Sequence, residues 1–177
     1  MKKIIAISGS TWAASTNLNL IKAIAELTGD RFEITIYEGL TGMPHFNHDL
    51  DNANPSSEVI MFRETLRTSD GILICTPEYA MGVPGTLKNA IDWTVSSMEF
   101  SNKPTALITA SSVGEKGHSS LLETLKIIEA KITDETQLLI SFAKTKISTA
   151  CKITDAKTMH QIMNLITNFE NSLIQLT

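Results

Sequence analysis

The sequence predicts an α/β fold in which a five-stranded parallel sheet, in the strand order 2-1-3-4-5, carries helices on both faces. One observation is that strand-like and helix-like segments alternate along the chain, as the crossover connections between parallel strands require. Another is that the strands read as continuous apolar runs, such as Ile4–Ile7 and Ile72–Cys75, which is typical of strands buried on both faces. Five strands fit this order better than the larger six-stranded dinucleotide-binding fold.

Five segments rich in apolar and β-branched residues predict the strands. They are Lys3–Ser8, Phe32–Tyr37, Gly71–Thr76, Pro104–Ala110 and, with a weaker pattern, Thr136–Ser141. Four segments repeat apolar residues at helical spacing. They are Ser15–Leu27, Ser57–Thr68, Gly85–Ser97 and Asp155–Leu176. Because no linker, repeat or low-complexity tract divides the chain, we expect residues 1–177 to form one domain.

Composition excludes several classes of function. The chain has 177 residues and a net charge of −4, and its 15 basic residues are scattered, which argues against nucleic-acid binding. The apolar run that follows Lys3 is too short for a signal peptide or a membrane span. Cys75 and Cys151 lack the spacing of a metal or redox motif. We therefore expect a cytoplasmic protein with no membrane association.

Three loops should meet at the carboxyl ends of the strands, where open parallel sheets bind their ligands. The first, Ser8–Asn17, supplies hydroxyls, an amide and backbone N–H groups at the start of a helix, which suits a monophosphate. A capped helix start with only local hydrogen bonds is an equally good interpretation of this loop alone. The second, Thr76–Gly85, has two prolines and two glycines, and such a rigid backbone suits a planar heteroaromatic ring.

The second loop and the helix after it carry a resemblance to a known family. Twelve positions match the pattern P-E-Y-N-x-S-x-P-G-x-L-K-N-A-I-D-W: Pro77, Glu78, Tyr79, Pro84, Gly85, Leu87, Lys88, Asn89, Ala90, Ile91, Asp92 and Trp93. This segment resembles the signature of the NADPH-dependent FMN reductase family, which includes chromate, quinone and azo-dye reductases. The resemblance implies a flavodoxin-like three-layer sandwich.

The other two loops extend the resemblance and also depart from it. The first is similar to G-S-x-R-x-x-S-x-N but has Trp12 in place of the arginine, which removes a charge-assisted bond to phosphate. The third loop, Thr109–His118, is similar to S-x-G-x-x-G-G-x-x-A, with matches at Ser112, Gly114 and Gly117. His118 replaces a glycine there, and we expect this histidine to lie exposed on the rim of the site.

The resemblance implies an FMN site built from all three loops, with NADPH or NADH as the electron donor. Its residues would be Ser10, Trp12, Ser15, Thr16 and Asn17 around the phosphate, Pro77, Glu78, Tyr79 and Ala80 along the ring, and Ser112, Gly114 and Gly117 at the other edge. No catalytic acid or base is implied, since hydride transfer to flavin needs none from the protein. The acceptor would be a small molecule, and the family is typically a homodimer or homotetramer.

Two other functions compete with an FMN-dependent reductase. A flavodoxin-type electron carrier would bind FMN without a nicotinamide site, although its usual strong acidity and phosphate loop are missing. A relative that has lost FMN is the other, and the departures at Trp12 and His118 keep this alternative open. His45 and His48 are the only hint of a metal site, and without further ligands at metal spacing we expect no metal.

Overall fold

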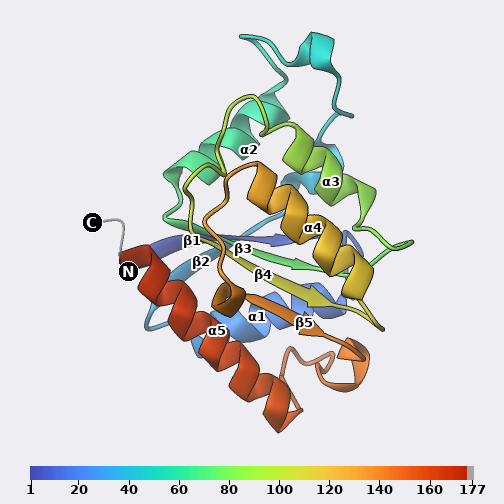
Figure 1. Ribbon diagram of the computed structural model, residues 1–177, viewed down its shortest axis with the longest axis vertical. Helices are drawn as coiled ribbons and strands as arrows, with labels where there is room; N and C mark the ends of the chain where they lie inside the picture. The colour runs from blue at the N-terminus through green and yellow to red at the C-terminus, as the bar shows by residue number, and fades with distance from the viewer. Residues whose placement is uncertain (175–177) are drawn as a thin grey trace.

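The computed structural model describes residues 1–174 and has five parallel strands in one sheet (Figure 1). The strands are β1 (Lys2–Ser8), β2 (Phe32–Tyr37), β3 (Gly71–Thr76), β4 (Thr105–Ala110) and β5 (Gln137–Ile140). Their order is β2-β1-β3-β4-β5, and every neighbouring pair is parallel. The predicted fold class and strand order are therefore confirmed.

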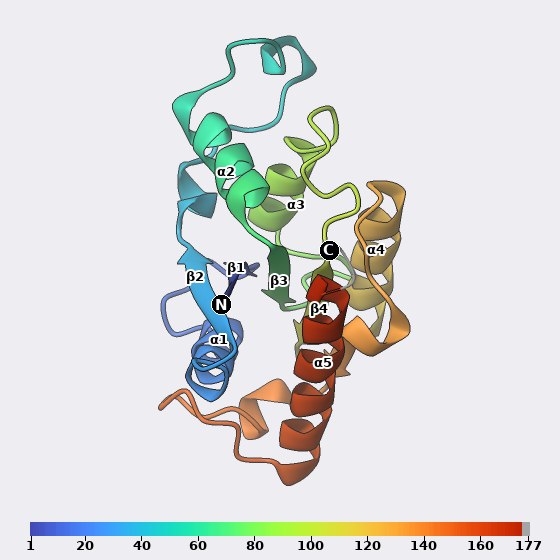
Figure 2. The same ribbon diagram turned by 90° about the vertical axis from the view of Figure 1, so that its left-hand side faces the viewer.

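Helices cover both faces of the sheet and complete three layers (Figure 2). One face carries α1 (Thr16–Leu27) and α5 (Ala156–Ile174), and the other carries α2 (Ser57–Thr68), α3 (Gly85–Asp92) and α4 (Glu115–Ile127). Within residues 1–174 no helix combines the length and the apolar character needed to cross a bilayer.

The pleat of the strands builds a separate core on each face. In β1, Ile4 and Ala6 pack on the side of α1 and α5, whereas Ile5 and Ile7 pack on the side of the other three helices. All four side chains are buried, which explains why this strand reads as an unbroken apolar run. Full burial of such an aliphatic side chain stabilises the fold by about 1.5–3 kcal/mol.

Three elements differ from the sequence prediction. Helix α4 was not predicted, because Gly114 and Gly117 at its start are typical of a loop. Helix α3 ends at Asp92 rather than Ser97, because the guanidinium of Arg63 binds the Trp93 carbonyl oxygen that a longer helix would use. The last predicted helix begins at Ala156, and its predicted end at Leu176 lies outside the described residues.

The signature residues after the second loop anchor a segment that projects from the molecule, residues 43–56 (Figure 1). The Asn89 side chain accepts a hydrogen bond from Phe46 N–H at 2.7 Å and donates to the Pro44 carbonyl oxygen at 2.9 Å. The indole N–H of Trp93 donates to the same carbonyl oxygen at 2.9 Å. Further along, Asp51 pairs with Arg63 of α2. This part of the signature therefore holds a loop in place.

Candidate functional site

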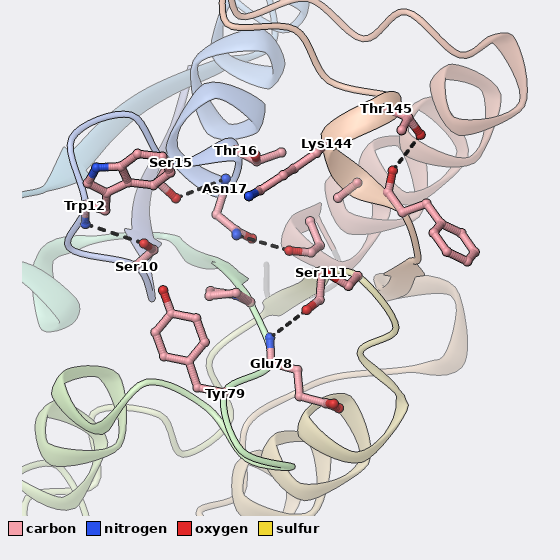
Figure 3. Close-up of a pocket in the computed structure, with 15 residues that line it drawn as sticks. Ser10, Trp12, Ser15, Thr16, Asn17, Glu78, Tyr79, Ser111, Lys144 and Thr145 are labelled. Carbon is pink, nitrogen blue, oxygen red and sulfur yellow. Dashed lines mark hydrogen bonds between the residues drawn. The ribbon is translucent and has the colours of Figure 1, made fainter.

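A pocket of about 350 Å³ lies at the carboxyl ends of the strands, where the three predicted loops meet (Figure 3). It is lined by Ser10, Trp12, Ser15, Thr16, Asn17, Pro77, Glu78, Tyr79, Ala110, Ser111, Ser112, Phe142, Ala143, Lys144 and Thr145. Nine of the twelve predicted site residues therefore come together, and Ala80, Gly114 and Gly117 do not line the pocket.

The first loop brings two buried hydroxyls to the N-terminus of α1. Ser10 Oγ accepts a hydrogen bond from Trp12 N–H at 3.4 Å, and Ser15 Oγ caps the helix by accepting from Asn17 N–H at 3.2 Å. Ser10 is only 8% exposed and Ser15 2%. Within residues 1–174 neither hydroxyl donates to an acceptor, so both O–H groups are free to donate to a ligand.

The positive end of the helix dipole adds to these donors. The first N–H groups of a helix lack partners within the helix, and together with the dipole they favour an anion. Thr16 is the first residue of α1 and lies beside Ser15 on the pocket wall. The arrangement therefore fits the phosphate of the expected FMN, since the two O–H groups and the helix N-terminus all favour an anion.

The side chain of Asn17 lines the pocket and bonds to two neighbouring strands. Its Nδ2 donates to the Ala110 carbonyl oxygen at 3.1 Å, and its Oδ1 accepts from the Cys75 thiol at 3.3 Å. Burial raises the pKa of the Cys75 thiol, which keeps its proton and remains a donor. The amide of Asn17 thus joins α1 to the ends of β3 and β4 and fixes the shape of the pocket.

The second loop is held on both sides of Glu78. Its backbone N–H donates to Ser111 Oγ at 3.2 Å, and its carboxylate accepts from Gly117 N–H at 2.6 Å. The ring of Tyr79 points into the pocket with its hydroxyl toward Ser10 (Figure 3). A rigid loop of this kind presents backbone groups to a planar ligand at fixed positions.

The tip of the same loop is a tight hairpin turn outside the pocket. Tyr79 and Gly82 exchange both backbone hydrogen bonds, at 3.0 and 2.9 Å. Ala80 and Met81 between them have φ values of 49° and 63°, the left-handed conformation that this type of turn requires. Neither residue is a glycine or an asparagine, so the turn carries backbone strain.

The two glycines of the third loop shape the site from behind. Gly114 caps α4 with φ 100°, and a Cβ there would lie 2.7 Å from Leu139 Cδ1. A Cβ on Gly117 would lie 2.6 Å from the Gly82 carbonyl oxygen and 3.0 Å from Glu78 Cγ. Only a glycine at position 117 allows the second loop to approach α4 this closely, so Gly117 sets the position of Glu78.

The expected exposure of His118 on the rim is wrong. The side chain is half-buried behind the pocket, with Nδ1 2.9 Å from Thr109 Oγ1 and Nε2 2.9 Å from Gln137 Oε1. Burial lowers the pKa of His118, and the bond to Gln137 opposes this shift in part. The histidine therefore ties α4 to β4 and β5 and does not line the pocket.

Six lining residues were not predicted from the sequence. Ala110 is the last residue of β4 and Ser111 follows it. Phe142, Ala143, Lys144 and Thr145 form the turn after β5. Only the pairing of β5 beside β4 places that turn at the pocket, and no local motif marks it. Lys144 is the one cation among the lining residues, which lie within the part of the chain that the structure describes.

The two histidines noted in the sequence lie apart from the pocket. No group of three or more His, Cys, Asp or Glu side chains converges within residues 1–174. His45 and His48 lie exposed on the projecting segment 43–56.

Comparisons with known proteins identify relatives of this chain. The chain is 31% identical over 179 residues to the NADH-dependent flavin reductase subunit 2 of Lactobacillus johnsonii, covering 94% of this chain and 95% of the relative. It is also 31% identical over 161 residues to an NAD(P)H-dependent FMN reductase of Pseudomonas aeruginosa, covering 88% and 86%. Among solved structures, FerB, a flavoenzyme NAD(P)H:(acceptor) oxidoreductase from Paracoccus denitrificans, shares the fold with a TM-score of 0.85, 23% identity and coverage of 99% and 98%.

A sequence model of NADPH-dependent FMN reductases matches residues 2–145, from the first strand to the end of the turn that carries Lys144. The match thus takes in every residue that lines the pocket. The chain belongs to the NADPH-dependent FMN reductase family.

Proposed function

We propose that the pocket binds FMN and that the protein passes electrons from NADPH or NADH through it to a small acceptor. The observation that carries this proposal is the pair of buried hydroxyls, Ser10 and Ser15, with free O–H groups at the start of α1. When bound, FMN supplies the redox chemistry, because its ring takes up a hydride and releases electrons to an acceptor. The protein supplies binding, orientation and access.

Each loop has a separate task in this proposal. Ser10, Ser15 and Thr16 bind the phosphate with the first N–H groups of α1. The backbone of Pro77–Tyr79 meets one edge of the ring, and Ser112 meets the other. Asn17, Ala80, Gly114 and Gly117 shape the loops around the cofactor, and Trp12 lies on the rim of the pocket. No side chain is assigned as an acid or a base.

The rim of the pocket suits a flat acceptor. Trp12, Tyr79 and Phe142 line the pocket and are all exposed, so they offer apolar, aromatic surface beside the proposed ring position. A quinone, an azo compound or a free flavin fits such a rim. A metal oxyanion would need only access to the edge of the flavin ring. The modest net charge of −4 favours an enzyme over an acidic electron carrier.

We also propose that residues 1–177 act as one FMN-binding domain in a cytoplasmic homodimer or homotetramer. Large apolar side chains are exposed on the projecting segment and on α2, among them Leu50, Ile60 and Met61. Such surface is typical of subunit contacts, and the segment 43–56 would then reach a partner's site. Light scattering coupled to gel filtration measures the assembly, and a monomer at all concentrations would contradict this part of the proposal.

Two measurements test the central proposal. An absorbance scan from about 350 to 500 nm should show flavin bands in the purified protein, or after FMN is added and the excess removed. Stopped-flow mixing with NADH and with NADPH should then bleach the bound flavin. If flavin binds but neither donor bleaches it, the protein is an electron carrier. If no flavin binds, it is a relative that has lost the cofactor.

A further inference from the structure

The pocket must neutralise a phosphate without an arginine. The chain has three arginines, and each is engaged away from the pocket: Arg31 with Glu170, Arg63 with Asp51, and Arg67 with Glu64 and Glu99. Trp12 occupies the position where the similar loop motif has an arginine. A positive side chain for the phosphate can therefore come only from another residue that lines the pocket.

Lys144 is in a position to provide it. Its side chain enters the pocket from the turn after β5, and its ammonium group points toward Thr16 and Asn17 at the start of α1 (Figure 3). Within residues 1–174 Lys144 forms no ion pair, whereas the carboxylate of Glu78, the other charged lining residue, is turned to Gly117 N–H. The lysine is thus free to bind an anion.

The backbone fixes the turn that carries Lys144. Phe142 N–H donates to the Ser112 carbonyl oxygen and Ala143 N–H to the Ser111 carbonyl oxygen, both at 3.0 Å. Phe142 adopts φ 55°, a left-handed conformation that is unfavourable for a bulky residue. Backbone strain of this kind persists only where the surrounding contacts determine it, and here it turns the chain so that the next residue but one enters the pocket.

We propose that Lys144 is the cationic phosphate ligand of this protein and takes over the task of the missing arginine. This inference rests on the proposed function. The ammonium group would complete a site whose other members are the hydroxyls of Ser10 and Ser15 and the N-terminus of α1. Unlike a guanidinium, it acts as a point charge without a bidentate geometry, so its contribution should depend strongly on salt.

The test compares two flavins that differ only in the phosphate. FMN and riboflavin are titrated into the flavin-free protein, and binding is followed by quenching of flavin fluorescence. Lys144→Met should weaken FMN binding by about tenfold, since a charge-assisted bond is lost, and should leave riboflavin binding unchanged. Lys144→Arg should retain the FMN affinity. Lys146→Met, two residues along but outside the pocket lining, is the matched control and should bind both flavins like the wild type.

Salt dependence gives a second readout. The wild-type affinity for FMN should fall with added NaCl more steeply than that of Lys144→Met, because one ionic contact is missing in the variant. Equal FMN affinities in the wild type and Lys144→Met, or an equal loss for riboflavin, would overturn the assignment of Lys144 while the proposed function stands. A wild type that binds neither flavin would overturn both.

Discussion

Gly117 positions the second loop because it has no side chain to keep that loop away from α4. Its Cα faces the Gly82 carbonyl oxygen and the side chain of Glu78, and its N–H holds the Glu78 carboxylate. Gly117→Ala should therefore push the second loop away from α4 and lower the free energy of unfolding by about 1–3 kcal/mol, as overpacking does. Urea unfolding followed by circular dichroism measures the change.

Gly85→Ala is the matched control for this substitution. A Cβ at Gly85 meets nothing within 4 Å, and the residue is the first of α3. Alanine there should leave stability unchanged or raise it by up to about 1 kcal/mol, because it reduces the freedom of the unfolded chain. If Gly117→Ala and Gly85→Ala had the same free energy of unfolding, a Cβ at position 117 would not disturb the contact with the second loop.

In the strained hairpin turn, a substitution should raise the free energy of unfolding, whereas Gly117→Ala should lower it. Met81 is exposed and has φ 63°, which glycine adopts without the steric cost that methionine bears. Met81→Gly should raise the free energy of unfolding by about 1 kcal/mol. The same change at exposed Met61 within α2 should lower it by about 1 kcal/mol, because glycine is a poor helix former. If both Met81→Gly and Met61→Gly lowered the free energy of unfolding, the backbone at Met81 would not be strained.

At the scale of elements, His118 couples α4 to the sheet in a manner that depends on pH. Its folded-state pKa is lowered from 6.5, so the unfolded chain binds more protons as the pH falls through that value. The stabilisation should be complete above about pH 6.5 and decline as the pH falls below it. Chemical unfolding between pH 7.5 and about pH 5 measures this decline.

His118→Gln should remove this part of the pH dependence. His160→Gln, at an exposed position of α5, should leave it in place. If the pH profile of His118→Gln matched that of the wild type, the bonds to Thr109 and Gln137 would not control the titration.

One anchor of the projecting segment is an ion pair. The Arg63 guanidinium lies 2.7 Å from Asp51 Oδ1, and both side chains are largely buried. Bonds from Ser96 and from Arg63 lower the pKa of Asp51, which stays ionised at neutral pH. Asp51→Asn leaves the guanidinium without its counter-charge and should weaken the anchoring of residues 43–56 by about 3 kcal/mol.

Limited proteolysis measures that anchoring. Chymotrypsin should cut after Phe46 or Leu50 faster in Asp51→Asn than in the wild type, because the segment opens more often. Asp49→Asn changes an exposed carboxylate of the same segment and should be cut at the wild-type rate. Similar rates for the two variants would show that the other anchors, at Asn89 and Trp93, are sufficient.

At the scale of the whole molecule, cofactor binding should be visible as stability. A ligand that binds only the folded state at about 100 times its Kd adds roughly 2.7 kcal/mol, which for a chain of this size is a rise in Tm of roughly 5–10 °C. Thermal unfolding with and without FMN measures it. An unchanged Tm at saturating FMN would contradict binding at the folded pocket.

Much of the architecture was predictable because its signals are local. The apolar runs of the central strands identify the sheet, and the motif from Pro77 to Trp93 identifies the second loop. Helix α4 was missed because its glycines serve a close approach that the sequence does not display. Lys144 was missed for a different reason: its place in the pocket follows from the pairing of β5 with β4, about which the neighbouring residues carry no signal.

The turn Phe142–Thr145 closes a pocket whose first wall is Ser10. During synthesis from the N-terminus, the loop that begins the site leaves the ribosome long before the turn that ends it. A nascent chain therefore has no complete pocket until residue 145 has emerged and β5 has joined the edge of the sheet. Capture of the flavin thus belongs among the last steps of maturation, after most of the sheet has formed.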